Sequence, residues 1–288
     1  MKTGLVLEGG GQRGIYTVGV LDCFADHGVE FDYCVGVSAG AANAVSYLSH
    51  QRGRNIRINT GYARDRRYLS LYNLVKNKSL FGMDFIFDEL PNHLDPFDYE
   101  AFFNCPTQME AGVTNLETAQ EEFFDKDSMR EHYSDVLKAS ASMPLFSPKV
   151  MIDGKPYYDG GTADPIPFER ALEQGCDRLV AVLTRDRKYV ERRTRGWLIY
   201  SKIFKAYQPM VHLLDTRHHI YNEERRRLFE LEKEGRAIVI APSRSLEITT
   251  FESRKEKLLK TWELGYVDAA RQLERIRDLK RSSSPAVK

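Results

Sequence analysis

Ser38 lies at the centre of a Gly-x-Ser-x-Gly pentad at residues 36–40 and has the setting of a nucleophile. At a sharp turn between a strand and a helix, such a pentad lifts the serine hydroxyl out of the sheet, where it can attack an acyl carbon. A second run, Gly-Gly-Gly-Gln-Arg-Gly at residues 9–14, follows another apolar segment. Its backbone N–H groups can bind the oxyanion that this attack creates. Together the two motifs predict hydrolysis of an acyl ester.

The glycine run is the more specific of the two motifs. From average composition, the serine pentad arises by chance in roughly one in ten chains of this length. Gly-Gly-Gly-x-Arg-Gly arises by chance in fewer than roughly one in a thousand such chains. Residues 9–14 also fit a dinucleotide fingerprint, which needs an acidic residue at the end of the following strand. Because Asp32 begins that strand and Ser38 follows its end, nucleotide binding is the weaker interpretation.

A serine nucleophile needs a base to accept its proton. The order Ser…Asp…His of a catalytic triad can be assembled from Ser38, then Asp159 or Asp164, then a histidine; the candidates are His212, His218 and His219. These histidines lie in a strongly charged stretch that is typical of a solvated helix face. Asp159 is the better candidate for the base itself, because it follows a predicted hairpin and precedes two glycines that allow close backbone approach.

Four motifs in this order give the chain its resemblance to the patatin-like phospholipases. They are residues 9–14, residues 36–40, an Ala-Ser-x-x-x-Pro segment at 139–144 and Asp-Gly-Gly at 159–161, and the similarity extends over about residues 2–183. The resemblance implies a Ser–Asp dyad without histidine, with Ser38 as nucleophile and Asp159 as its direct base. A carboxylate with an ordinary pKa near 3.9 is a weak base for a serine proton, so we expect a dry site that raises this pKa.

The resemblance also implies how the oxyanion is held and which substrates are cleaved. The backbone N–H groups of Gly10, Gly11 and Gln12 would bind the oxyanion, with Arg13 supporting the loop and the Ala39 N–H close by. The implied substrates are phospholipids, lysophospholipids or related fatty-acyl esters, cleaved through an acyl-enzyme without metal or cofactor. A general carboxylesterase or thioesterase with the same dyad, or a catalytically silent lipid-binding protein, is the alternative.

The elements that must position these residues alternate between strand and helix. Apolar runs at 4–7 and 31–37 each lead into a motif and then into a helical segment, at 15–27 and 39–50. This order predicts an α/β fold of three layers, α/β/α, with a mostly parallel central sheet. Further predicted elements are hairpins at 109–124 and 150–158, strands at 178–184 and 237–241, and helices at 135–142, 168–174, 218–234 and 252–280.

The predicted domain organisation is a patatin-like catalytic domain over residues 1–250, with an inserted cap at about 55–105. A C-terminal helical extension, 251–280, is expected to pack on it, and the tail 281–288 is expected to be disordered. Four apolar residues of the cap are candidates to line an acyl channel or, alternatively, to form a local core: Leu80, Phe81, Phe85 and Phe87.

Composition narrows the range of partners. The net charge is +1, which argues against nucleic acid, and the four cysteines have no paired spacing, as expected for reduced thiols in the cytoplasm. The sequence has no apolar run long enough to span a membrane, no acidic loop with calcium-ligand spacing and no indication of a particular oligomeric state.

A basic stretch with aromatic neighbours suggests where the chain would touch a membrane. Residues 185–195 carry six Arg and Lys, and Trp-Leu-Ile-Tyr follows at 197–200. This combination favours peripheral contact with an anionic membrane, at its inner face for a cytoplasmic protein. The alternative is a solvated loop followed by a helix that faces the core.

Overall fold

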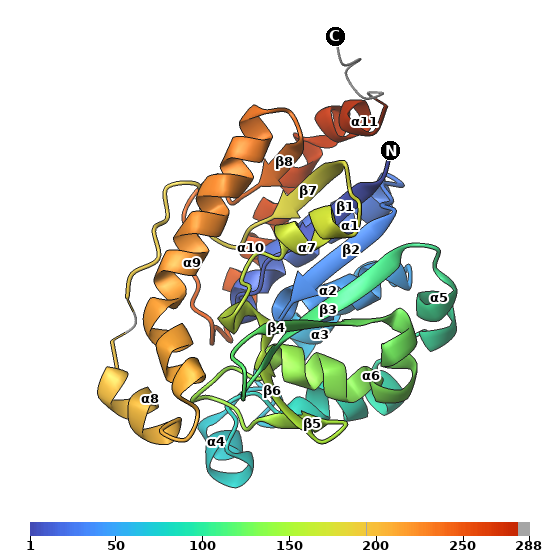
Figure 1. Cartoon of the computed structure of the whole chain (residues 1–288). Coiled ribbons are helices and arrows are strands. Elements are labelled where there is room, and N and C mark those ends of the chain that lie inside the picture. Colours follow the sequence, from blue (N-terminus) through green and yellow to red (C-terminus); the bar gives the residue numbers. More distant parts are fainter. Residues whose placement is uncertain (194, 282–288) are drawn as a thin grey trace.

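One mixed sheet of eight strands forms the centre of the protein in the computed structural model, which describes residues 1–193 and 195–281 (Figure 1). The strand order is β5-β6-β3-β2-β1-β7-β8, with β4 also paired to β3. The strands are β1 (Thr3–Leu7), β2 (Tyr33–Val37), β3 (Gln108–Asn115), β4 (Glu121–Asp125), β5 (Val150–Ile152), β6 (Lys155–Asp159), β7 (Arg178–Val182) and β8 (Ala237–Ile240).

The five strands β3, β2, β1, β7 and β8 are parallel, whereas β4 and β6 run antiparallel to β3 and β5 runs antiparallel to β6. Strands β1 and β2 are buried throughout, which explains their unbroken apolar character. The expected α/β fold with a mostly parallel sheet is confirmed, as are the hairpins, which are β3–β4 and β5–β6.

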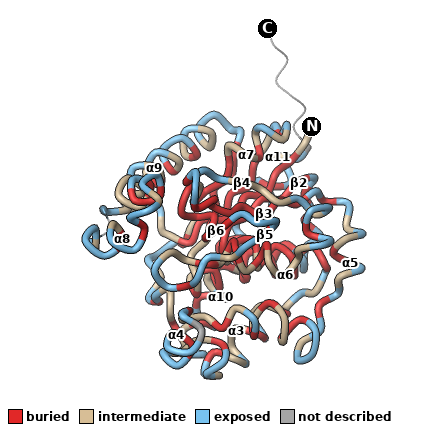
Figure 2. Tube along the Cα trace, turned by 60° about the horizontal axis from the view of Figure 1, so that its bottom comes forward, coloured by how far each residue is buried: buried red, intermediate tan, exposed pale blue. Residues whose placement is uncertain are grey.

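Helices cover both faces of the sheet (Figures 1 and 2). Successive side chains of a strand point to opposite faces; accordingly Leu5 and Leu7 pack in one buried cluster and Val6 packs in another. The first cluster is covered by α1 (Ile15–Asp26), α2 (Ala39–Leu48), α6 (Lys126–Ala141), α10 (Lys255–Ala270) and α11 (Leu273–Arg281). The second is covered by α7 (Phe168–Glu173) and α9 (Gln208–Lys233).

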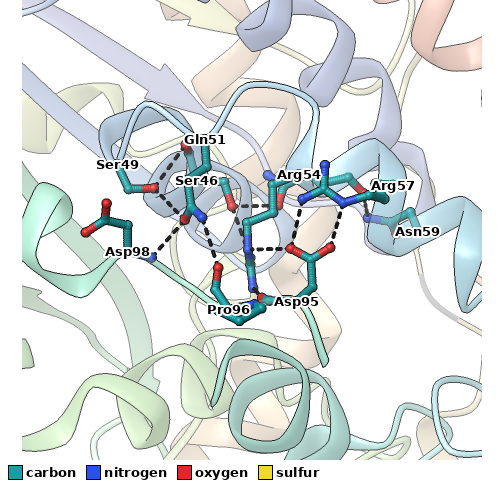
Figure 3. A network of polar contacts seen from close by, with 10 residues as sticks. Ser46, Ser49, Gln51, Arg54, Arg57, Asn59, Asp95, Pro96 and Asp98 are labelled. Atoms are coloured by element: carbon teal, nitrogen blue, oxygen red, sulfur yellow. Dashed lines mark hydrogen bonds and ion pairs between the residues drawn. The ribbon is translucent and has the colours of Figure 1, made fainter. Parts of the chain in front are cut away.

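The segment predicted as an inserted cap folds into short helices: α3 (Arg54–Gly61), α4 (Leu71–Asn77), η2 (Phe85–Leu94) and α5 (Tyr99–Asn104). A buried ion pair fastens this segment to α2 (Figure 3). The Arg54 guanidinium lies 3.3 Å from the Asp95 carboxylate and donates to the Ser46 hydroxyl, while Arg57 forms a second pair with Asp95. These contacts join both ends of the insertion to the helix that follows Ser38.

Three helices differ in extent from the predictions. Helix α6 begins at Lys126 instead of 135, because Asp125 accepts the Ser128 N–H as its N-cap, and it is kinked at His132. Helix α9 begins at Gln208 instead of 218. The single helix expected for 252–280 is two helices, α10 and α11, separated at Arg271–Gln272. Residues 282–288 of the predicted disordered tail lie outside the described part of the chain.

Candidate active site

Ser38 forms the turn between β2 and α2 in a strained backbone conformation. Its φ is 54° and its ψ is −127°, a combination that non-glycine residues rarely adopt. The flanking glycines permit this turn: a Cβ at Gly40 would lie 2.3 Å from the Leu7 carbonyl oxygen, and one at Gly36 would lie 2.7 Å from the Ala41 nitrogen. The pentad therefore presses the start of α2 against β1 and leaves Ser38 at the carboxyl end of the parallel strands.

Ser140 holds this turn from the opposite side. The Ser38 N–H donates to the Ser140 hydroxyl oxygen at 2.9 Å, and that hydroxyl donates to the Gly112 carbonyl oxygen of β3 at 2.7 Å. Ser140 is fully buried. The Ala-Ser-x-x-x-Pro segment thus connects the turn to the sheet through Ser140. Nothing in the sequence indicates that Ser140, and not Ser142, makes this connection.

Replacing Ser140 with alanine is expected to lower the free energy of unfolding by about 1–3 kcal/mol, because it leaves the buried Ser38 N–H without an acceptor. We also expect kcat to fall more than KM changes, since the serine loses its alignment. Ser142→Ala is the matched control: its hydroxyl donates only to the Lys138 carbonyl oxygen of the same helix. Urea denaturation and ester turnover of both variants provide the comparison, and equal kcat values would refute a positioning role for Ser140.

Asp159 ends β6 and Ser38 follows β2, and the two residues lie on opposite sides of β3 at nearly the same position along it. The pairing partners of Val37 and Asp159 are neighbours on β3, Gly112 and Val113. The Asp159 carboxylate accepts the Gly161 N–H at 2.8 Å, and it lines the same cavity as Ser38, whose side chain favours its ionised form. Its backbone N–H donates to the Ser142 carbonyl oxygen at 2.8 Å. Both dyad candidates are therefore fixed to the 139–144 segment.

Burial raises the pKa of Asp159 to about 6. The Ser38 side chain, the Gly161 N–H and the positive charge of Arg217 oppose this shift, but desolvation is the largest contribution. A carboxylate with this pKa is a stronger base than an exposed aspartate and is still ionised at neutral pH. Direct proton transfer from a serine hydroxyl to a carboxylate requires such an environment.

The histidines of the alternative triad lie elsewhere. None of His212, His218 and His219 lines either of the two cavities that Ser38 lines, and all three are carried by α9. Asp164, the other candidate acid, is half-buried, and desolvation followed by repulsion from Glu121 and Glu169 raises its pKa. Desolvation and repulsion from Asp164 raise the pKa of Glu224. The structure brings none of these residues to Ser38.

The glycine loop approaches Ser38 closely. A Cβ at Gly9 would lie 2.9 Å from the Ser38 Cβ, and Gly10 and Gly11 both have positive φ, 154° and 56°. Among the described residues, the N–H groups of Gly10 and Gly11 have no hydrogen-bond acceptor, so they are available to an oxyanion.

The other two loop residues predicted to serve the oxyanion have backbone N–H groups that are already occupied. The Gln12 N–H donates to the Thr250 carbonyl oxygen at 3.0 Å, and the Arg13 N–H donates to the Gly10 carbonyl oxygen at 3.2 Å. The prediction of a Gln12 donor is therefore wrong for this loop conformation. The Arg13 guanidinium donates to the Thr250 hydroxyl at 2.7 Å, which ties the loop to the C-terminal segment.

Two cavities of different character meet at Ser38. The first is lined mainly by apolar residues of α2, α6 and the insertion, among them Ala42, Ile58 and Ile86. Of the four cap residues predicted for an acyl channel, Phe81 and Phe87 line it. Phe85 packs instead in a local core, and Leu80 is not among the lining residues.

The second cavity, called the polar cavity below, has charged side chains among its apolar lining and also contains Asp159. Several of its walls come from the C-terminal part of the chain. Arg217 and Tyr221 of α9 line it together with Thr250 and Arg185. The Tyr221 hydroxyl donates to Glu8, whose carboxylate also accepts the Thr184 N–H. No sequence motif indicates these contributions, because each depends on contacts between residues that lie far apart along the chain.

In the part of the chain that the structure describes, no group of three or more His, Cys, Asp or Glu side chains is arranged to hold a metal ion. No helix there combines the length and the apolar character needed to cross a bilayer.

Comparison with known proteins places this site in a family. The patatin-like phospholipase family matches residues 5–172, and a domain family of unknown function, DUF6363, matches residues 207–281. The uncharacterized protein YjjU of Escherichia coli is 28% identical over 282 residues, covering 92% of this chain and 75% of its own length.

More distant relatives carry an activity in their names. The lysophospholipase NTE1 of Saccharomyces cerevisiae is 24% identical over 220 residues, but the match spans 69% of this chain and only 12% of NTE1. Among solved structures, VipD from Legionella pneumophila aligns with a TM-score of 0.49 at 15% identity, covering 95% of this chain and 67% of VipD. Because the family match covers more than half of the chain and includes both Ser38 and Asp159, this protein belongs to the patatin-like phospholipase family.

Proposed function

We propose that this protein is a serine lipid acyl hydrolase, of the phospholipase A or lysophospholipase type, that acts through a Ser38–Asp159 dyad. The observation that carries the proposal is the buried Asp159 carboxylate, which lines one cavity with Ser38 across β3 and has its pKa raised to about 6. Family membership and the lysophospholipase relatives support a lipid ester as substrate. The apolar cavity on one side of Ser38 suits a fatty-acyl chain.

In the first half of the reaction, the Ser38 oxygen attacks the ester carbonyl carbon while Asp159 accepts the hydroxyl proton. The N–H groups of Gly10 and Gly11 stabilise the negative charge that develops on the carbonyl oxygen. The bond between the acyl carbon and the alcohol oxygen then breaks, and the proton held by Asp159 passes to the departing alcohol. The acyl group remains on Ser38 as an ester.

In the second half, water attacks this acyl-enzyme and Asp159 accepts a proton from the water. Collapse of the tetrahedral intermediate releases the fatty acid and returns the proton to Ser38. The enzyme therefore ends each cycle in its starting protonation state. The strained turn at Ser38 keeps the nucleophile exposed to both cavities throughout.

Labelling with a fluorophosphonate tests the proposal, because this probe reacts only with an activated serine. We expect wild-type protein to be labelled and to hydrolyse long-chain acyl esters faster than short-chain ones. Preference for short-chain esters or thioesters would instead indicate a general esterase or thioesterase. A folded protein that binds lipid but is neither labelled nor active would be a silent binding protein.

A second observation favours peripheral contact with an anionic membrane. Helix α8 (Trp197–Ile203) lies at the periphery of the molecule (Figures 1 and 2). Trp197, Leu198 and Ile199 are 51%, 77% and 60% exposed, whereas Tyr200 is buried. The exposed basic residues Arg192, Arg195, Lys202 and Lys205 flank this apolar face. A helix with exposed apolar residues and basic neighbours suits an anionic lipid surface.

We expect the triple substitution W197A/L198A/I199A to reduce binding to phosphatidylglycerol vesicles by tenfold or more, on the order of 1–2 kcal/mol for the lost apolar area. The free energy of unfolding should change little, because these side chains are exposed. Leu259→Ala, which removes an exposed apolar side chain from α10, is the control. Sedimentation with vesicles of phosphatidylglycerol and of phosphatidylcholine measures the effect. Equal binding by the triple variant and wild type would rule out this surface.

A further inference from the structure

The segment matched by the family of unknown function packs into the active site. Residues 207–281 include α9, which places Arg217 in the wall of the polar cavity beside Asp159. Arg185, which lies between the two matched families and follows β7, lines the same cavity. Both arginines therefore lie beyond residues 5–172, the stretch that matches the patatin-like family. The volume of this cavity, about 380 Å³, is in the range of small-molecule sites.

Arg217 is held in place by the backbone next to the dyad. Its Nε donates to the Gly161 carbonyl oxygen at 2.8 Å, two residues after Asp159. No carboxylate in the described part of the chain forms an ion pair with it. One nitrogen thus fixes the guanidinium, while its other nitrogens keep their capacity to donate to a ligand.

Arg185 is oriented in a different way and is likewise without an ion pair among the described residues. Its guanidinium lies over the ring of Tyr189, 4.3 Å from the centroid. Its positive charge acts on Arg13, which lines the same cavity. Several other arginines of the fold are neutralised, as in the pairs of Arg170 with Glu110 and of Arg187 with Glu232.

The carboxylates of the polar cavity are already engaged. Glu8 accepts from Thr184 and Tyr221, and Glu191 accepts the Tyr189 hydroxyl at 2.7 Å. Asp159 accepts the Gly161 N–H. The cavity therefore presents positive charge that its own acids do not pair with, in a partly buried setting where an anion with several oxygens would bind arginines well.

We propose that Arg185 and Arg217 bind a phosphate group on the alcohol portion of the substrate, so that the C-terminal segment selects phosphate-bearing esters. This proposal rests on the proposed function, which places the acyl chain in the apolar cavity. Because Ser38 lines both cavities, an ester whose carbonyl carbon is at Ser38 extends its alcohol portion into the polar one. A glycerophosphate headgroup carries its phosphate a few bonds from the cleaved ester.

The test compares two substrates with the same acyl chain, a lysophosphatidylglycerol and an uncharged monoacylglycerol. For Arg185→Gln and Arg217→Gln, we expect the ratio of kcat/KM for the phosphate ester to that for the neutral ester to fall about tenfold or more, as for the loss of a charge-assisted hydrogen bond. Arg217→Lys should lose less, because it keeps the charge. Arg277→Gln, which removes an exposed arginine of α11 outside the cavity, should keep the wild-type ratio.

An unchanged ratio in both glutamine variants would overturn the proposal, and so would an equal loss on both substrates, which would make the arginines supports of the dyad. Calorimetry measures the binding of glycerophosphate and of inorganic phosphate to Ser38→Ala protein. This measurement distinguishes failure of the phosphate-binding proposal from failure of the proposed function. Arginine-dependent binding of glycerophosphate would support the site even without turnover. If inorganic phosphate binds as tightly while the substrate ratio stays constant, the headgroup assignment fails.

Discussion

Ser38→Ala and Asp159→Asn are each expected to lower ester hydrolysis by about 10⁴-fold or more. The first variant removes the oxygen that forms the acyl-enzyme. The second replaces the carboxylate proposed as the base with an amide that accepts no proton. Fluorophosphonate labelling should be lost in both. Labelling of Asp159→Asn at the wild-type rate would show that another group activates the serine.

The pH dependence of kcat/KM provides an independent check on the base. Since burial raises the pKa of Asp159 to about 6, its ionised fraction increases tenfold per pH unit below that value and is nearly complete above pH 7. We expect kcat/KM to follow this curve, with a rising limb and then a plateau. Asp153→Asn is the matched control, because Asp153 is exposed in the β5–β6 turn and its positive φ is well tolerated by asparagine.

The same pKa shift predicts that the ionised Asp159 carboxylate lowers the free energy of unfolding. An aspartate whose pKa is raised on folding stabilises the protein below its ordinary pKa of 3.8, and this contribution is lost as pH rises through about 6. The difference corresponds to about 3 kcal/mol at neutral pH. Asp159→Asn should therefore unfold at a higher urea concentration than wild type at pH 8, with the gap closing at pH 4. A less stable variant at pH 8 would contradict the assignment of a buried, ionised carboxylate.

Gly265→Ala is expected to destabilise the protein by about 3 kcal/mol or more and to reduce activity as well. A Cβ at Gly265 of α10 would lie 2.0 Å from the Tyr16 carbonyl oxygen of α1, and one at Gly19 of α1 would lie 1.9 Å from the Trp262 carbonyl oxygen of α10. The two helices thus contact each other through their backbones, and a methyl group must push them apart. Because α1 follows the glycine loop directly, this separation also displaces the oxyanion donors.

Thermal and urea unfolding of Gly265→Ala, with ester turnover at a temperature where both proteins are folded, measure these effects. Gly61→Ala is the control: Gly61 ends α3, a Cβ there meets no atom within 4 Å, and alanine favours a helix, so stability should stay the same or increase. If Gly265→Ala is as stable as Gly61→Ala, the close crossing of α1 and α10 is not a determinant of the fold.

The sequence determined those parts of the fold that depend on local patterns. Buried parallel strands appear as unbroken apolar runs, and Asp153-Gly154 marks the β5–β6 turn, so the α/β class and both hairpins could be predicted. The candidate nucleophile Ser38 and base Asp159 could be identified because short motifs surround them. Helix ends were less accessible. Pro209 in the first turn of α9 is a local signal for a start at Gln208, which the predicted start at 218 did not use, whereas the break between α10 and α11 carries no proline.

Only the tertiary structure decided which groups surround the dyad. It engages the Gln12 N–H, a predicted oxyanion donor, in a hydrogen bond to Thr250. It also leaves the three histidines outside the cavities that Ser38 lines and sets Ser140 beneath the turn. It also brought Arg217 to the residues that follow Asp159. The physical reason is common to all of these features: hydrogen bonding and desolvation depend on which segments the packed core brings together, and here those segments are dozens to hundreds of residues apart along the chain.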